Sequence, residues 1–376
     1  MPRAPGFAAS AAAVRGGVFA RHAARIAALQ GETYPFHVGD LWKDPPPGAC
    51  FGDVDARAFP AIHRYADPRG LPPLIAALAA SEAVDPGQVI VTAGATGALA
   101  ALAAATLDPG DEVLIPAPYW PLIPGVVQTA RGRPVELSGF EAGPVPGLSW
   151  AAAVGPRTAA LYLNNPHNPS GRVLSAEELA AIATFARAHD LWIWADEVYA
   201  PFAWSRPFLP MRAFAPERTF TALSFSKAWA MAGNRCGALL VPPVGEAMDR
   251  VRACGVHTVY ACATGVQVAA LRALEGGAAW RAETAAEVAA ITAEAARALG
   301  VPCPDGGTFL FFDVRSRLDA RGLDGLLSDA LDANVIVAPG AACGQDYGTH
   351  IRVCTSAVQP ERSRRGLARL AALLGR

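Results

Sequence analysis

Short apolar runs alternate with longer amphipathic segments from about residue 88 onward. The pattern predicts a helix over residues 94–107 and another over residues 175–189, where Ser175 and Glu178 form an S-x-x-E capping box. Strands separated by helices of ten or more residues predict βαβ units and a mainly parallel sheet, with ligands at the carboxyl ends of its strands. The runs typical of buried strands are QVIVTA (88–93), DEVLIP (111–116), TAALYLNN (158–165), LWIWAD (191–196), RTFTALSFS (218–226) and GALLVPP (237–243).

The pattern changes after about residue 280. A long Ala/Glu helix over 278–300 is followed by the strand-like runs GTFLFFDV, ANVIVAPG and HIRVCTS and by a final helix. This predicts a smaller α+β domain, against which an N-terminal helix over 8–29 is expected to pack. The expected division is residues 1–45 and 281–376 for the small domain and residues 46–280 for the large one.

Composition and charge exclude several classes of function. Hydrophobic residues make up 52% of the 376 residues. Every stretch of 18 or more residues is nevertheless interrupted by a charged residue, a proline or a glycine, so no membrane span is expected. The 32 basic and 33 acidic residues form no block of like charge, which argues against a nucleic-acid groove or a membrane-binding face. Any anion that the protein binds is expected to be small and locally held.

The seven cysteines are scattered, odd in number and never spaced as C-x-x-C. This favours a reducing compartment, and we expect a cytoplasmic protein without a metal site. Residues 1–31 contain no acidic side chain and carry Arg3, Arg15, Arg21 and Arg25 among alanines. A transit peptide is one interpretation of that pattern, and an ordinary N-terminal helix is the other.

Lysine is rare in this chain, because all but two of the 32 basic residues are arginine. The two lysines are Lys43 and Lys227. A lysine forms a Schiff base with an aldehyde when it is deprotonated, whereas arginine stays charged and cannot. Ser224 lies three residues before Lys227 and Arg235 eight after it, so a hydroxyl and a guanidinium are available for an anion near the amine. A solvated surface lysine is the alternative interpretation.

Further stretches fit a phosphorylated aldehyde cofactor. In TAGATGAL, Gly94, Ala95 and Thr96 stand where a strand turns into a helix, so backbone N–H groups can hold a phosphate; a plain tight turn is the alternative. Asp196 ends a buried strand in WADEVY, where a carboxylate requires a cation such as a protonated ring nitrogen, unless it caps the next turn.

Four aromatic or amide side chains complete the set. Tyr199 is placed to hydrogen-bond a ring oxygen of the cofactor. Asn168 leaves a strand through two Asn-Pro steps, which restrict its backbone. PAPYWP offers Tyr119 and Trp120 as faces for stacking.

The motifs NNPHNPSG, WADEVY and SFSKAWAMAGNRCG, in this order, resemble those of the class I/II aminotransferases of the fold-type I pyridoxal-phosphate superfamily. The resemblance covers essentially the whole chain, from YPFHVGD and YADPRGLPPL to PGAACGQDYGTHIRVCTSA. It implies an α/β large domain with a mainly parallel, seven-stranded sheet between helices, and a smaller α+β domain built from the N- and C-terminal segments.

The resemblance also implies roles for individual residues. Lys227 is expected to form the internal aldimine with pyridoxal 5′-phosphate and to shuttle the proton. Asp196 would keep the pyridine nitrogen protonated, while Asn168 and Tyr199 bind the ring's O3′ side. Trp120, rather than Tyr119, is expected to stack on the ring. The expected phosphate ligands are Gly94, Ala95, Thr96, Ser224 and Arg235.

On the substrate side, the resemblance implies that Arg352 grips the α-carboxylate through a bidentate fork, with Gly39 and Asn168 beside the substrate. Tyr65 matches a tyrosine that reaches the phosphate of the other subunit, so a homodimer with shared active sites is expected. The implied reaction moves an amino group between an L-amino acid and a 2-oxo acid.

The sequence departs from the family pattern at two places. His257, Thr258 and Tyr260 replace a small-polar, proline-containing segment, so no partner contact is assigned to residues 255–265. Arg252 is expected at the surface, and no clear arginine marks the place that holds a second substrate carboxylate. A general, aromatic or small neutral amino acid is therefore the expected substrate.

Two alternative functions remain open at this point. The same site could catalyse a β- or γ-elimination, as in a C–S lyase or a cyclopropane-forming synthase, because the cofactor carries the chemistry. The other alternative is a transcription regulator that binds pyridoxal phosphate and uses this fold as an effector sensor; such a protein would carry an additional N-terminal DNA-binding module.

Overall fold

A seven-stranded sheet forms the centre of the larger part of the molecule. The structure is a computed structural model that describes residues 5–14, 16–18, 20–140, 143, 145 and 148–375. The strand order is β2-β8-β7-β6-β5-β3-β4, and only β8 runs antiparallel to its neighbours. The predicted α/β fold with a mainly parallel sheet is therefore confirmed. The strands are β2 (Val89–Thr92), β3 (Glu112–Pro116), β4 (Arg133–Leu137), β5 (Thr158–Asn164), β6 (Trp192–Asp196), β7 (Thr219–Ser224) and β8 (Gly237–Leu240).

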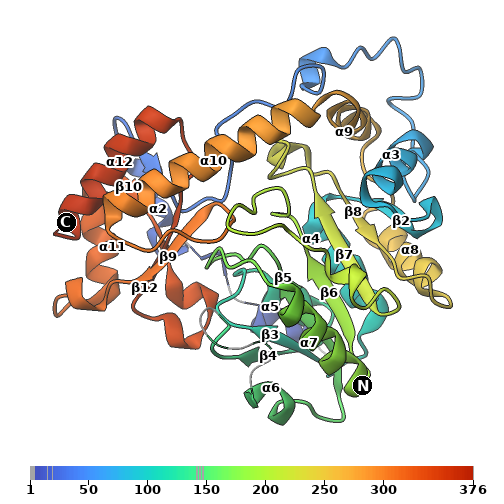
Figure 1. Cartoon of the computed structure of the whole chain (residues 1–376), viewed down its shortest axis with the longest axis horizontal. Coiled ribbons are helices and arrows are strands. Elements are labelled where there is room, and N and C mark those ends of the chain that lie inside the picture. The colour runs from blue at the N-terminus through green and yellow to red at the C-terminus, as the bar shows by residue number, and fades with distance from the viewer. Residues whose placement is uncertain are drawn as a thin grey trace.

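Helices cover both faces of this sheet (Figure 1). On one face, α4 (Gly94–Thr106), α5 (Ile123–Thr129) and α8 (Ala247–Thr258) share a core with β3, β5, β6, β7 and β8. On the other face, α6 (Leu148–Ala152) and α7 (Ala176–Ala188) pack on β3, β5 and β6. The capping box predicted for α7 is confirmed, because Ser175 and Glu178 exchange both hydrogen bonds.

The strand β4 is absent from the predicted strand runs. It contains Pro134, which has no N–H to donate, and proline is tolerated chiefly in edge strands. In the structure β4 is the last strand in the sheet order and pairs only with β3. Its weak sequence signal thus follows from its position at the edge.

A smaller body holds the C-terminal strands. Antiparallel β11 (Ala338–Pro339), β12 (His350–Cys354) and β9 (Phe309–Asp313) form one sheet, and β1 (Tyr34–Pro35) pairs with β10 (Val335–Ile336) in parallel. Helices α11 (Gly322–Asp332) and α12 (Pro360–Leu373) share its core. N-terminal β1 thus pairs with a C-terminal strand, while the domain division at residues 45 and 280 stays a prediction.

Helix α10 (Ala278–Leu299) links the two bodies (Figure 1). Its Val288 belongs to the core that includes β2 and β8, whereas Ala295 and Leu299 belong to the core of the small body. Helices α3 (Pro72–Glu82) and α9 (Thr264–Gly276) complete the core at the β2 side of the large sheet.

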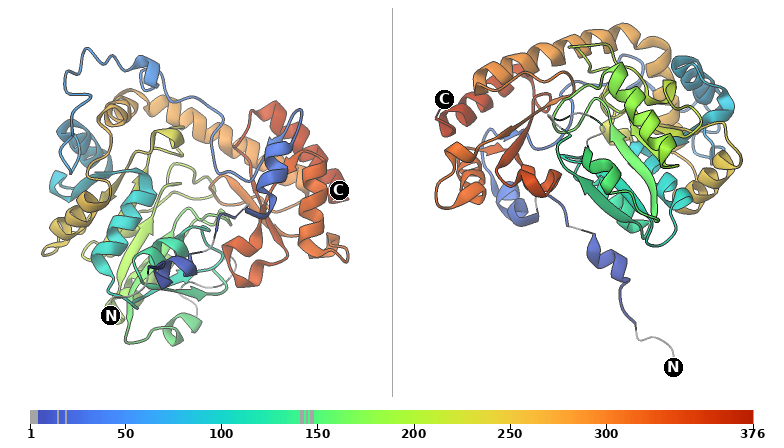
Figure 2. Two further views of the ribbon diagram at one scale, coloured as in Figure 1. Left: turned by 180° about the vertical axis from the view of Figure 1, so that it is seen from behind. Right: turned by 60° about the horizontal axis from the view of Figure 1, so that its bottom comes forward.

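The prediction of one N-terminal helix over 8–29 is wrong. The described part of this segment contains two short α-helices, α1 (Ala9–Ala13) and α2 (Ala23–Ala28). Because each interior glycine destabilises a helix by about 1 kcal/mol relative to alanine, Gly16 and Gly17 disfavour a continuous helix here. Helix α1 packs on α5, whereas α2 lies beside α11, where Arg25 donates to Asp332 over 2.7 Å (Figure 2). Of the arginines noted above, Arg3 and Arg15 lie outside the described residues.

Across the described ranges, no helix has both the length and the apolar character needed to cross a membrane.

Candidate active site

A cavity of about 250 Å³ opens where β5, β6 and β7 end and α4 begins. This is the edge of the sheet at which ligands of parallel sheets bind. Eleven of the predicted site residues line it together with Val38, Leu99, Asn164, Val198, Ser226 and Phe309. The eleven are Gly39, Ala95, Thr96, Trp120, Asn168, Asp196, Tyr199, Ser224, Lys227, Arg235 and Arg352.

Lys227 lies in the loop between β7 and β8. Its Nζ donates a hydrogen bond to the carbonyl oxygen of Gly39 and lies 6.0 Å from the centre of the Tyr199 ring. Burial lowers the pKa of this amine; Cys354 and Asp40 counteract that effect, and the guanidiniums of Arg352 and Arg235 add to it. The amine is therefore easier to deprotonate than an exposed lysine, as a nucleophilic lysine requires.

Asp196 is the last residue of β6 and is buried. Its Oδ2 accepts a hydrogen bond of 2.7 Å from the hydroxyl of Tyr162, but its Oδ1 has no hydrogen-bond partner. Burial raises the pKa of this carboxyl to about 6, although Tyr162 and Lys227 counteract that effect. A buried carboxylate oxygen without a partner is costly, so a cationic ligand at Oδ1 would be stabilising.

Asn168 lies between Tyr199 and Arg352. Its Oδ1 accepts a hydrogen bond of 2.9 Å from Arg352 Nη1, and its side chain also interacts with the Tyr199 hydroxyl. Asn164 fixes the backbone here, because its Oδ1 accepts from the N–H of Asn168 over 2.6 Å. Burial raises the pKa of Tyr199, so the phenol stays protonated and able to donate.

Arg352 reaches the cavity from β12 of the small body and is buried. Its Nη2 donates to the carbonyl of His37 over 3.0 Å, and its guanidinium carbon lies 4.4 Å from the centre of the Phe309 ring. Its Nε has no hydrogen-bond partner. A buried guanidinium with an unused donor is suited to a carboxylate ligand.

The opposite end of the cavity is built around the first turn of α4. Ser224 pairs with Gly237 across β7 and β8, which brings Ser224 and Arg235 to one edge. Arg235 Nη1 donates to Ser226 Oγ over 3.2 Å, and its Nη2 would lie 2.6 Å from a Cβ added at Gly94. Gly94 also has a φ of +73°, so any side chain there would be strained and would collide with Arg235.

No side chain caps the N-terminus of α4. The N–H groups of Ala95 and Thr96 belong to its first turn, where backbone donors have no intrahelical acceptor. Together with Arg235, Ser224 and Ser226 they form a set of donors suited to a phosphate.

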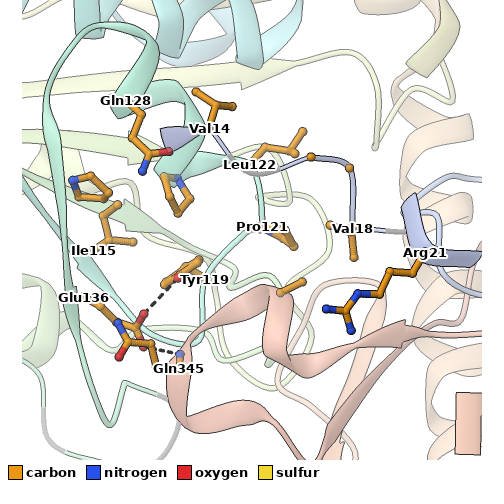
Figure 3. Close-up of a pocket in the computed structure, with 16 residues that line it drawn as sticks. Val14, Val18, Arg21, Ile115, Tyr119, Pro121, Leu122, Gln128, Glu136 and Gln345 are labelled. Carbon is orange, nitrogen blue, oxygen red and sulfur yellow. Dashed lines mark hydrogen bonds between the residues drawn. The ribbon is translucent and has the colours of Figure 1, made fainter. Parts of the chain in front are cut away.

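The two aromatic residues of PAPYWP are separated in the structure. Trp120 lines the 250 Å³ cavity, whereas Tyr119 lines a different cavity of about 560 Å³ (Figure 3). There the Tyr119 hydroxyl donates to Glu136 over 3.1 Å, beside Leu122 and the N-terminal segment. Among the described residues that line this larger cavity there is no lysine and, apart from Tyr119, no residue that the sequence suggested for the site.

Two other residues lie away from the 250 Å³ cavity. Tyr65 is 87% exposed, and its ring centre lies 4.8 Å from that of Tyr260. Arg252 pairs with Asp249 at the surface over 3.1 Å, as expected. In the described part of the chain, no group of three or more His, Cys, Asp or Glu residues is arranged to hold a metal ion.

The structure adds residues that sequence reasoning missed. Ser226 directly precedes Lys227 in SFSK, so proximity to the lysine was a usable signal. Tyr162 and Asn164 alternate along β5 and act on Asp196 in the next strand, a contact that depends on strand pairing. Val38 directly precedes Gly39, so proximity to a predicted residue was a usable signal there as well. Phe309 comes from a segment remote in sequence and carried no signal.

The chain is similar to known aminotransferases. A family model described as aminotransferase class I and II matches residues 36–370. The aspartate/prephenate aminotransferase of Thermus thermophilus is 35% identical over 334 residues, which is 83% of this chain and 84% of that protein. The arginine–pyruvate transaminase of Pseudomonas aeruginosa is 33% identical over 344 residues, 84% of each chain.

A solved structure agrees with these relatives. The N-succinyldiaminopimelate aminotransferase of Mycobacterium tuberculosis has a TM-score of 0.89 and 28% identity, covering 98% of this chain and 100% of that one. These matches confirm the predicted fold type and the predicted aminotransferase activity. The chain therefore belongs to the class I and II aminotransferase family, whose members are pyridoxal-phosphate enzymes.

Proposed function

We propose that this aminotransferase holds pyridoxal 5′-phosphate in the 250 Å³ cavity, with Lys227 as its covalent anchor, and that its amino donors are L-amino acids with a neutral side chain. The observation that carries the proposal is that one of only two lysines shares this cavity with the unpartnered Oδ1 of buried Asp196. A protonated pyridine nitrogen would supply the missing partner.

The remaining donors fit the rest of the cofactor. The first turn of α4, Ser224, Ser226 and Arg235 would hold the phosphate, in a cradle that a side chain at Gly94 would fill. Asn168 and Tyr199 would bind the ring oxygen, and Trp120 would lie against the ring.

When bound, the cofactor supplies a carbonyl that condenses with amines and a ring that takes up the electrons of the substrate's Cα–H bond. Lys227 accepts the proton from Cα and returns it, because its Nζ lies in the cavity with a lowered pKa. Arg352 holds the substrate carboxylate through the guanidinium N–H groups that are not already hydrogen-bonded to Asn168 and His37. This grip sets the orientation of the Cα–H bond.

The charges of the cavity support a neutral side chain on the donor. Among the described residues that line it, the basic side chains are Lys227, Arg235 and Arg352, and each is already assigned. The other lining residues include Val38, Leu99, Val198 and Phe309. A second carboxylate would therefore lack a cation within this subunit, which disfavours aspartate and glutamate.

The surface supports a homodimer. Tyr65 and Tyr260 form an exposed aromatic pair next to Val259, which is 51% exposed. Large exposed apolar groups mark interaction sites, and Tyr65 is proposed to reach the phosphate in the partner's cavity.

A cytoplasmic location is also part of the proposal. It is supported by the seven cysteines, all of which lie within the described residues and form no disulfide.

The experiment is a transamination assay with a panel of donors. Purified protein is loaded with pyridoxal 5′-phosphate and given L-phenylalanine, L-leucine, L-alanine, L-aspartate or L-glutamate, with pyruvate, 2-oxoglutarate or oxaloacetate as acceptor. The neutral donors should give the higher kcat/KM, and product should require an acceptor. Ammonia released without an acceptor would show elimination instead, and a preference for L-aspartate would contradict the neutral pocket.

A further inference from the structure

The buried contact between Tyr162 and Asp196 is not explained by packing alone. Tyr162 is 1% exposed and lies on β5, where it is opposite Trp194 of β6. Its hydroxyl donates to Asp196 Oδ2 over 2.7 Å. Burying a phenol next to a carboxylate is costly unless the two groups bond to each other, and this pair does so inside the core.

The bond leaves the two oxygens of Asp196 in different states. Oδ2 is occupied by Tyr162, while Oδ1 has no partner. The backbone of Asp196 is fixed separately, because its carbonyl accepts from Asn164 Nδ2 over 2.7 Å and from the N–H of Asn165 over 3.1 Å. Since both backbone and Oδ2 are held, the orientation of Oδ1 is held as well.

Several titratable groups act on this carboxylate. Tyr162 from β5 and Lys227 from the loop after β7 stabilise its ionised form, as does the N–H of Val198. Glu197 and Tyr199 follow it in the chain and interact with it electrostatically. Burial raises the pKa of Tyr162 well above its ordinary value, so its hydroxyl remains a donor across the whole working pH range.

We propose that Tyr162 is a positioning residue for cofactor binding: its hydroxyl keeps Asp196 ionised and turns Oδ1 toward the ring nitrogen of pyridoxal phosphate. This inference rests on the proposed function, in which Asp196 pairs with that nitrogen. Tyr162 touches neither the cofactor nor the substrate in this role and acts only through Asp196.

The test is equilibrium binding of pyridoxal 5′-phosphate to the apo protein, measured by titration calorimetry between pH 5.5 and pH 8.5. Removing the hydroxyl in Tyr162→Phe takes away a hydrogen bond to a charged group, so the pKa of Asp196 rises further. The acid limb of the binding profile should then move up by about one pH unit, so the affinity should fall nearly tenfold at about pH 5.5 and about twofold at pH 7. The difference from wild type should shrink toward pH 8.5.

Tyr34→Phe is the matched control. Tyr34 is also 1% exposed and donates to a carboxylate, Glu32 Oε2, over the same 2.7 Å, but it lies on β1 in the small body. Its removal should leave the binding profile unchanged. The phosphate group of the ligand titrates alike in every variant and cancels in the comparison.

A double variant separates an effect through Asp196 from a general packing effect. In an Asp196→Asn background there is no carboxylate to ionise, so adding Tyr162→Phe should not shift the pH profile further. An unshifted profile for Tyr162→Phe alone, or an equal shift in both backgrounds, would overturn the inference while leaving the proposed function intact. Wild-type protein that binds no cofactor at Lys227 would overturn both.

Discussion

Arg352 Nη1 and Asn168 Oδ1 are joined by a buried hydrogen bond of 2.9 Å between residues 184 positions apart in the chain. Arg352 belongs to β12 of the small body, and Asn168 belongs to the loop after β5 of the large sheet. The candidate substrate site is therefore closed by contacts between the two bodies. Any change that alters their relative position is expected to change substrate binding before cofactor binding.

Arg352→Lys should lower kcat/KM for amino donors by about 100-fold, which corresponds to about 3 kcal/mol. One ammonium cannot satisfy Asn168, His37 and a substrate carboxylate at once, and it lacks the planar fork. Cofactor affinity should stay within about twofold of wild type. Steady-state kinetics and a cofactor titration measure the two effects, with the surface variant Arg252→Lys as control. Equal losses of both would argue against a substrate role.

Lys227→Arg should abolish turnover, because arginine supplies no titratable amine. Borohydride reduction followed by peptide mass spectrometry should attach the cofactor to Lys227 in wild type and to no residue in the variant. Lys43→Arg is the control, since Lys43 pairs with Glu287 over 2.8 Å outside the cavity and its charge is preserved. Cofactor attached to Lys43 would refute the assignment.

Asp196→Asn should stabilise the apo protein while removing activity. Burial raises the pKa of the folded-state carboxyl from 3.8 to about 6, so ionisation opposes folding. This destabilisation of the folded protein is absent below about pH 4, where the carboxyl is neutral in both the folded and the unfolded state. Above about pH 6 it reaches its full value of about 3 kcal/mol. Thermal unfolding at pH 4 and pH 8 should show a gain in Tm for the variant only at pH 8. The same gain at both pH values would contradict this origin.

Gly39→Ala should weaken substrate turnover by about tenfold through overpacking. A Cβ at this position would lie 2.7 Å from Cζ of Phe309 and 3.6 Å from the Tyr199 hydroxyl. Replacing the Phe309 ring by a smaller side chain in the double variant Gly39→Ala/Phe309→Leu should restore part of the lost activity. The measurement is kcat/KM of the single and double variants. Additive losses would show that the contact with Phe309 is not the cause.

Local patterns determined much of this protein. Alternating apolar runs located six strands of the large sheet, and Ser175 with Glu178 located the start of α7. These features depend on residues a few positions apart, so a window of sequence contains their cause. The scarcity of lysine and the spacing of Ser224, Lys227 and Arg235 also identified one end of the site. Ser224 ends β7, and the other two lie in the short connection from β7 to β8.

Only the tertiary structure decided which distant groups meet. The contacts of Arg352 with Asn168, of Tyr162 with Asp196 and of Gly39 with Phe309 join different strands or bodies, and no periodicity encodes them. It also decided that α1 and α2 are separate short helices that pack on different bodies. The pKa of Asp196 follows from the same source, since desolvation depends on every segment packed around the carboxylate and not on its neighbours in sequence.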